Sequence, residues 1–144
     1  VSRTMSKAFA FAGARVGYLA ADPAIADALR LVRLPYHLSA LTQAAATAAL
    51  GHADTMLSMV DEIVAQRDRI SATVAALGYT AHESWTNFVL FGGVDEPAVT
   101  WQALYDRGVL IRDVGIPHHL RVTAGTADET TAFLDALASV GSRA

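Results

Sequence analysis

The stretch TMSKAFAFAGARVGY, residues 4–18, places Lys7 between hydroxyl side chains and a nearly continuous apolar segment. A lysine charge is costly to remove from water unless it is paired, neutral or covalently engaged. Thr4 and Ser6 can donate hydrogen bonds to an anion, and Arg15 offers a planar fork suited to a phosphate. The lysine therefore sits within a set of anion-binding groups.

These groups favour pyridoxal phosphate, because that cofactor presents a phosphate together with an aldehyde with which a lysine amine can react. Gly13 would let the chain turn closely past such a ligand. A second interpretation stays open on spacing alone. Lys7 could extend from a loop into solvent along its aliphatic stem, with Arg15 in an ordinary ion pair.

The length of 144 residues suits one ordinary domain or a piece of a larger protein. Because the first residue is Val1 and the first residues already resemble the middle of a fold, we expect a fragment. No run of about 18 apolar residues is present, and no basic-then-apolar leader opens the chain. We therefore expect neither a membrane span nor export, and predict a cytoplasmic protein.

The charged residues argue against several classes of function. Eleven basic and fourteen acidic residues give a formal charge of -3, and the basic residues are scattered, which argues against nucleic acid as a partner. The chain has no cysteine, which excludes disulfides, thiolate zinc sites and cysteine nucleophiles. Its acidic residues form no isolated pair of the hydrolase type.

The first half of the chain predicts one buried strand followed by helices. Residues 14–22 are mostly apolar and end at Asp22, a helix N-cap before Pro23. Ser39 can cap a second helix, whose alanines permit close approach of a neighbouring backbone. The expected elements are a strand over 14–22 and helices over 23–33, 40–50 and 54–77.

After Gly78 the pattern becomes strand, helix, strand, strand, helix. The spacing of Thr126 and Glu129 predicts a capping box before the last helix. The expected elements are strands over 86–93, 109–115 and 119–125, a helix over 96–108 and a helix from 126 onward. We therefore expect an α/β fold in two parts, with the break inside the long helix over 54–77.

The run SRTMSKAFAFAGARVGYLAAD, residues 2–22, closely resembles the lysine loop of fold-type I aminotransferases, specifically histidinol-phosphate aminotransferases of actinobacterial type. Further motifs of that family follow in the same order. They are RLPYHLSALTQAAA (33–46), TNFVLF (86–91), GVLIRDVG (108–115) and LRVTAGT (120–126).

The resemblance implies the C-terminal part of a fold-type I pyridoxal-phosphate transferase. Residues 1–52 would end the large cofactor-binding domain, and residues 53–144 would form a small α/β domain with a short, mostly antiparallel sheet on helices. Lys7 would carry the cofactor and act as the catalytic acid and base. Ser6 and Arg15 would hold the cofactor phosphate, and Thr4 would support the same loop.

The resemblance also implies residues at the substrate end, each with an alternative. Arg121 would grip the substrate α-carboxylate, or else form a strand-edge salt bridge. Arg112 would act at the same end, or pair with the neighbouring Asp113. Asn87 would position the carboxylate, or satisfy a buried turn. Tyr36 would contact the substrate or pack at a subunit interface.

The histidines depart from the family pattern at His37, His118 and His119. Adjacent residues of an extended segment point to opposite faces, so His118 and His119 cannot chelate one metal ion together. We predict no metal site from histidine spacing. We interpret the pair as loop residues near the mouth of the substrate site.

By resemblance, the complete enzyme would transfer an amino group between histidinol phosphate and 2-oxoglutarate in histidine biosynthesis, as a homodimer. Several cofactor-contacting residues of the family precede its lysine, so we expect residues 1–144 alone to show no appreciable transamination. Three alternatives stay open. They are an aromatic-amino-acid aminotransferase, a phospho-amino-acid decarboxylase of the same scaffold, and a non-catalytic packing domain.

Overall fold

The computed structural model describes residues 1–141, and the chain divides into two compact units. The first unit is Val1–Val60 and the second begins at Asp61. Each unit is described by itself below. Within residues 1–141, no helix is both long enough and apolar enough to span a bilayer.

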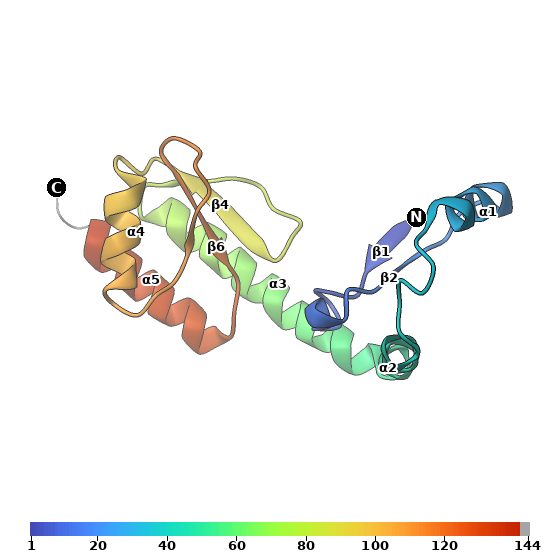
Figure 1. Ribbon diagram of the computed structural model, residues 1–144. Coiled ribbons are helices and arrows are strands. Elements are labelled where there is room, and N and C mark those ends of the chain that lie inside the picture. Colours follow the sequence, from blue (N-terminus) through green and yellow to red (C-terminus); the bar gives the residue numbers. More distant parts are fainter. Residues whose placement is uncertain (142–144) are drawn as a thin grey trace. The chain divides into compact units, whose positions relative to one another are not determined.

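The first unit consists of a small hairpin and helices (Figure 1). Strand β1 (Ser2–Thr4) pairs antiparallel with β2 (Gly17–Leu19), and a short 3-10 helix, η1 (Ala12–Ala14), lies in the connecting loop. Helix α1 (Pro23–Val32) and helix α2 (Ala40–Leu50) follow. Both predicted N-caps are confirmed, since Asp22 accepts from Ala24 N and Ser39 from Thr42 N.

Helix α3 (Ala53–Ala76) begins in the first unit and ends in the second. Its predicted C-terminal stop at Gly78 is confirmed. Gly78 has φ 92°, and the Tyr79 amide donates to Val74 O, which closes the last turn. Ile70 and Val74, four residues apart on one face of this helix, are buried.

The second unit is a four-stranded antiparallel sheet with helices, which confirms the expected α/β class. The strand order is β3-β4-β6-β5. The strands are β3 (Thr80–Ala81), β4 (Phe88–Gly92), β5 (Arg112–Asp113) and β6 (His119–Thr123), and the helices are α4 (Pro97–Tyr105) and α5 (Ala127–Gly141). The sequence pattern predicted all of these elements except β3.

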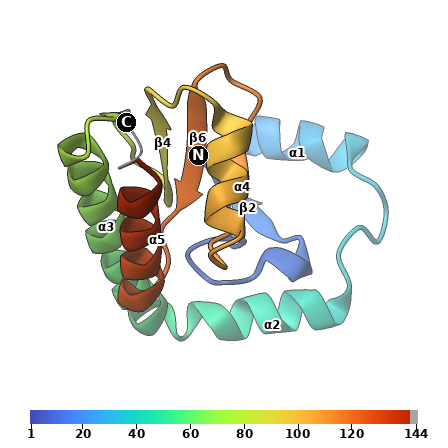
Figure 2. The same ribbon diagram turned by 90° about the vertical axis from the view of Figure 1, so that its left-hand side faces the viewer.

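The core lies on one face of this sheet. Val89 and Phe91 of β4 and Leu120 and Val122 of β6 alternate with outward residues, as period-2 strands require, and pack with buried residues of α3, α4 and α5. Helices α3 and α5 lie side by side (Figures 1 and 2), joined by the Arg69 Nη2 to Thr131 Oγ1 hydrogen bond of 2.8 Å. Among residues 61–141, the helices pack against this inward face and leave the opposite face of the sheet uncovered.

The predicted capping box of α5 is confirmed in both directions. The Thr126 amide donates to Glu129 Oε2 at 2.8 Å, and the Glu129 amide donates to Thr126 Oγ1 at 3.3 Å. Phe133, Leu134 and Leu137 of the same helix are buried. The last helix therefore forms as its local sequence dictates.

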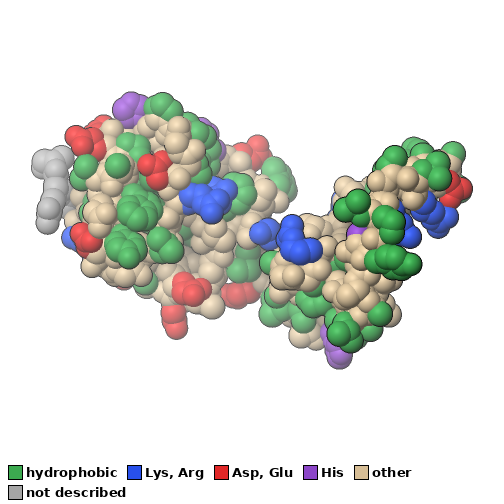
Figure 3. Space-filling model, in the orientation of Figure 1, with side chains coloured by type: hydrophobic (Ala, Val, Ile, Leu, Met, Phe, Trp, Pro, Cys, Tyr) green, Lys and Arg blue, Asp and Glu red, His purple; other side chains and the backbone are tan. Residues whose placement is uncertain are grey.

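The prediction of a buried strand over 14–22 is wrong in two respects. The strand is only Gly17–Leu19, and all three residues are exposed. The apolar face of α1, with Ile25, Leu29 and Val32, is exposed as well. Figure 3 shows hydrophobic side chains spread over the surface of this unit, so the pattern identified apolar faces that residues 1–141 do not cover.

Candidate active site

The lysine loop is closed by the β1–β2 hairpin. Thr4 stands opposite Gly17, and the Met5 amide donates to Val16 O at 3.1 Å. Lys7 and Arg15, eight residues apart in sequence, therefore lie on one loop whose two ends are held together. A side chain at Gly17 would meet Arg3 O at 2.5 Å, so this strand pairing requires a glycine there.

The described residues themselves impose no steric constraint at Gly13, which we expect to let the chain turn closely past a ligand. A Cβ added at Gly13 meets no atom within 4 Å, and its φ is not positive. Nothing in the described chain therefore requires glycine at this position. The close backbone approach of this loop occurs instead at Gly17.

The hydroxyl groups before the lysine form a local network. The Thr4 hydroxyl donates to Ser6 Oγ at 2.9 Å and accepts from the Ser6 amide at 3.1 Å. This turn orders the backbone directly before Lys7 and directs the half-buried Ser6 hydroxyl. These two hydrogen bonds give Thr4 the loop-supporting position that the family resemblance implies.

Lys7 is exposed, which corrects the premise that the apolar run buries its charge. Among residues 1–141, its ammonium group takes part in no ion pair or hydrogen bond. Arg15 is also exposed, has a left-handed backbone with φ 53°, and uses Nη1 to donate to Ala12 O at 3.1 Å. Both cations are therefore available to a ligand.

The lysine loop packs on helix α2. Met5 and Val16, from the two ends of the loop, are buried together with Ala46 of α2. The small alanine side chain permits this close approach, as the alanine-rich sequence predicted. The helix thus supports the loop that carries Lys7 and Arg15.

Arg121 lies on the uncovered face of the sheet in the second unit. Its strand β6 is an inner strand, so a strand-edge salt bridge does not describe its position. Within residues 1–141 its guanidinium has no carboxylate partner, and its buried Nε makes no hydrogen bond. The guanidinium carbon lies 4.6 Å from the centre of the Phe88 ring, which orients the group by a cation–π contact.

Arg112 stands directly opposite Arg121 in the β5–β6 register, so the two side chains share one face. The alternative partner of Arg112 is otherwise engaged, because Asp113 Oδ1 accepts from the Gly115 amide at 2.9 Å. Like charges directly opposite each other repel, and an anion between them would relieve that repulsion. The arrangement suits a carboxylate or a phosphate.

The other two residues expected at the substrate end differ in their surroundings. Asn87 is half-buried directly before β4, and its backbone carbonyl accepts from the Ala124 amide at the end of β6. Its side chain makes no hydrogen bond to the described residues, so it satisfies no turn there. Tyr36 is fully exposed in the loop between α1 and α2, with a left-handed φ of 55°.

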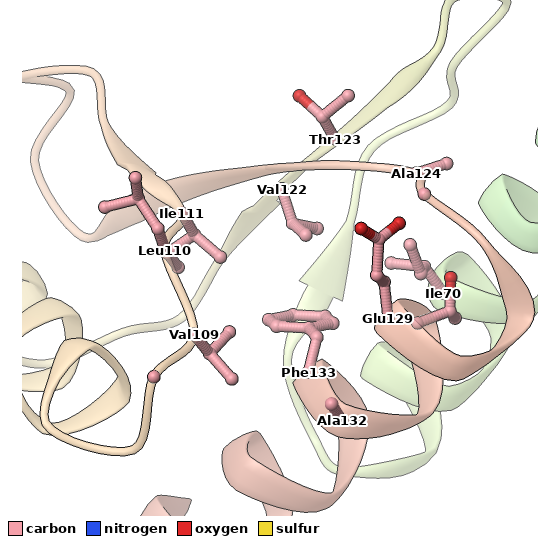
Figure 4. A pocket seen from close by; sticks show the side chains of 13 residues that line it. Ile70, Val109, Leu110, Ile111, Val122, Thr123, Ala124, Glu129, Ala132 and Phe133 are labelled. Atoms are coloured by element: carbon pink, nitrogen blue, oxygen red, sulfur yellow. The ribbon is translucent and has the colours of Figure 1, made fainter.

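A hollow of about 440 Å³ lies behind β6, on the helix side of the sheet (Figure 4). Val122 points into it towards Phe133, whereas Thr123 points away. Thr130, which is 2% exposed, also lines the hollow, and its hydroxyl has no partner among the described residues. The hollow is therefore separated from the Arg121 face by the sheet itself.

The sequence of this chain matches the profile described as "Aminotransferase class I and II" over residues 1–137. The chain belongs to the class I and II aminotransferase family. Its motifs at Lys7, Arg15, Asn87 and Arg121 all fall within the matched residues.

Two relatives within this aminotransferase family are especially similar. The chain is 62% identical over 137 residues to a histidinol-phosphate aminotransferase of Paenarthrobacter aurescens, covering 95% of this chain and 37% of the relative. It is 64% identical over 136 residues to the histidinol-phosphate aminotransferase of Mycolicibacterium smegmatis, covering 94% and 36%. The chain thus spans little more than a third of the length of these relatives.

Solved aminotransferase structures share the fold. The histidinol-phosphate aminotransferase of Sinorhizobium meliloti, solved in complex with pyridoxal-5'-phosphate, matches with a TM-score of 0.78 and 32% identity. The match covers 97% of this chain and 40% of that chain. The two-part α/β architecture is therefore that of the aminotransferase fold.

The sequence did not reveal three features of the candidate site. They are the direct opposition of Arg112 and Arg121, the Phe88 ring under the guanidinium, and a contact between His82 and His119. All three depend on strand register. The alternation of apolar residues in 88–92 and 119–123 is enough to predict that these two strands pair. It does not predict the register, that is, which residue of one strand lies opposite which residue of the other.

Proposed function

We propose that the protein is a pyridoxal-phosphate-dependent aminotransferase that acts on histidinol phosphate with 2-oxoglutarate in histidine biosynthesis. The observation that carries the proposal is the 57–64% identity to histidinol-phosphate aminotransferases over nearly the whole of this chain. Because the chain spans about 37% of the length of such a relative, we further propose that it forms the C-terminal part of the enzyme.

The lysine loop would hold the cofactor. Its residues fit this group, because Lys7 offers an amine with no partner in residues 1–141, and Ser6 and Arg15 offer a hydroxyl and a guanidinium for the phosphate. Thr4 would keep Ser6 in place through its two hydrogen bonds. When bound, pyridoxal phosphate supplies the electron sink that makes the substrate carbon acidic. Lys7 Nζ would take that proton and return it.

The uncovered sheet face would hold the substrate anion. Arg121 would bind the α-carboxylate with two parallel N–H donors, since its guanidinium is oriented by Phe88 and has no competing carboxylate. Arg112 would add a second positive charge from the neighbouring strand, and the free Asn87 amide would complete the carboxylate site. Tyr36 would act at the substrate or at the subunit boundary of a homodimer.

The decisive experiment measures transamination by the full-length protein with histidinol phosphate and with phenylalanine as donors. We expect histidinol phosphate to be preferred and 2-oxoglutarate to be required as acceptor. A preference for phenylalanine would support the aromatic aminotransferase alternative. Carbon dioxide release without an acceptor would support a decarboxylase.

The cofactor assignment has a separate test. Borohydride treatment of the loaded full-length protein, followed by peptide mass spectrometry, should place the pyridoxyl label on Lys7. A K7A variant should lose the label while retaining its far-UV circular dichroism. Absence of a label in the unaltered protein would overturn the assignment of Lys7, whatever the substrate proves to be.

A further inference from the structure

His82 and His119 meet on the uncovered face of the sheet, although they are 37 residues apart in sequence. Their Nε2 atoms are 3.0 Å apart, and their ring centres are 5.1 Å apart with an interplanar angle of 23°. The two nitrogens therefore lie between the rings and face each other. This contact belongs neither to the lysine loop nor to the Arg112–Arg121 pair.

The contact depends on a glycine between the two histidines. Gly92 of β4 stands opposite His119 of β6, and the His82 amide donates to Leu90 O of the same strand β4. A Cβ at Gly92 would come within 2.6 Å of His119 Nε2. The His119 ring thus passes over the bare backbone of Gly92 to reach His82.

Hydrogen bonding fixes which nitrogen of His119 carries the proton. Its Nδ1 lies 2.7 Å from Pro117 O, and a carbonyl oxygen can only accept, so Nδ1 is the donor. When the His119 ring is neutral, its Nε2 therefore carries a lone pair. This lone pair accepts a hydrogen bond from the Nε2–H group of His82. A backbone carbonyl on the second ring nitrogen is also the usual support of a metal-binding histidine.

We propose that His82 and His119 form a two-histidine site for one transition-metal ion, bound through both Nε2 atoms. Their 3.0 Å separation is close to that of two neighbouring nitrogens on an ion with metal–nitrogen bonds of about 2.0–2.1 Å. His119 is held in place, and the exposed His82 ring can turn to direct its lone pair at the ion. The proton of His82 moves to Nδ1, where solvent can hydrogen-bond to it. Both ligands therefore stay neutral.

The ligand type selects the metal. Two imidazoles and no carboxylate suit copper, nickel and zinc, whereas magnesium and calcium prefer oxygen ligands. No group of three or more histidine or acidic residues that could hold a metal occurs within residues 1–141, so water would complete the coordination. The site would therefore bind and release its ion readily, in the affinity order Cu²⁺ above Ni²⁺ above Co²⁺.

The test is calorimetric titration of the full chain with Ni²⁺ and Cu²⁺ in the absence of pyridoxal phosphate. We expect one ion per chain, and a weakening of about tenfold or more in H82A and in H119A. H118A is the matched control, because His118 is adjacent in sequence but directs Nδ1 to Val94 O. G92A gives a further check, since it retains both histidines and obstructs their approach, and it should also weaken binding.

Three results would overturn the proposal. They are undetectable binding to the unaltered chain, equal binding by H82A or H119A and the unaltered chain, and a loss in H118A as large as that in H119A. Circular dichroism of each variant separates loss of the site from loss of the fold. None of these measurements uses enzyme activity, so the outcome is independent of the proposed aminotransferase function.

Discussion

Replacing Arg121 by methionine should leave the fold as stable or more stable, although it removes a half-buried charged side chain. The Nε atom of Arg121 is buried without a hydrogen-bond partner among the described residues, a situation that costs about 1–3 kcal/mol. Repulsion from Arg112 directly across the strand pair adds about 0.2–1 kcal/mol. Methionine removes both costs and keeps an unbranched apolar side chain.

The replacement also loses a favourable contact. The cation–π attraction to Phe88 at 4.6 Å contributes about 0.5–1 kcal/mol at such a site. The balance is a gain in the free energy of unfolding of about 2 kcal/mol, and each kcal/mol raises the melting temperature of a chain of this length by about 2–4 °C.

Urea unfolding of the full chain, followed by far-UV circular dichroism, measures this balance directly. R112M is the matched control. It removes the same charge repulsion but leaves Arg121 Nε unpaired, so it should stabilise by about 0.2–1 kcal/mol, which is less than R121M. A loss of about 1 kcal/mol or more in R121M would show that Arg121 has a structural partner, and would refute its assignment to a ligand.

The same variant should lose activity in the full-length protein. A bidentate, charge-assisted pair with a substrate carboxylate contributes about 1.5–3 kcal/mol, so kcat/KM should fall by about 10- to 150-fold. R121K retains the positive charge but lacks the two parallel N–H donors of the guanidinium, so its kcat/KM should lie between those of R121M and the unaltered protein. Higher stability together with lower activity is expected where a side chain serves a ligand and not the fold.

Three further predictions concern the fold. E129A removes half of the capping box and should cost about 1 kcal/mol in thermal unfolding, whereas a loss below about 0.3 kcal/mol would contradict the cap. G17A should disrupt the β1–β2 hairpin and reduce pyridoxal phosphate incorporation, because a Cβ at this position meets Arg3 O. The control G13A should be tolerated. Equal losses of incorporation in G17A and G13A would contradict this steric argument. Burial and the Asp95 carboxylate raise the pKa of Tyr79 above 10.0, so the unfolded chain loses its phenol proton first. Stability should therefore fall as pH rises above 10, and less so in Y79F.

The helix termini were predictable because their chemistry is local. The caps at Asp22 and Ser39 and the box of Thr126 and Glu129 each join residues two or three positions apart. Any chain with those residues in a helical frame offers the same hydrogen bonds. The start of each of these helices is therefore determined by residues within one helical turn, and the rest of the fold is not needed to predict it.

The burial of the 14–22 segment was not predictable for a different reason. Apolar residues such as Tyr18 and Leu19 indicate that a face gains free energy by leaving water. They do not indicate which surface covers that face. Within residues 1–141 no surface covers these two residues, so their side chains are exposed.

The pairing of Arg112 with Arg121 required the geometry of a turn. The chain between β5 and β6 contains two residues with positive φ, Gly115 and His118. A shift of one residue in that turn would send Arg121 into the core and Leu120 to the open face. Sequence could identify both arginines as candidates but could not place them opposite each other.

The cations of the two candidate sites depart from otherwise consistent local chemistry. The chain forms the caps of α1, α2 and α5 and keeps its core mostly apolar. Yet among the described residues Lys7 has no partner, and Arg121 and Arg112 face each other without an acid. Folding alone does not favour the two opposed arginines, since they leave positive charge uncompensated, whereas the exposed Lys7 keeps its hydration. The anions that we propose, a phosphate beside the lysine loop and a carboxylate on the sheet face, would compensate these charges. If our proposal holds, Arg112 and Arg121 are positions at which the requirements of binding outweigh those of folding.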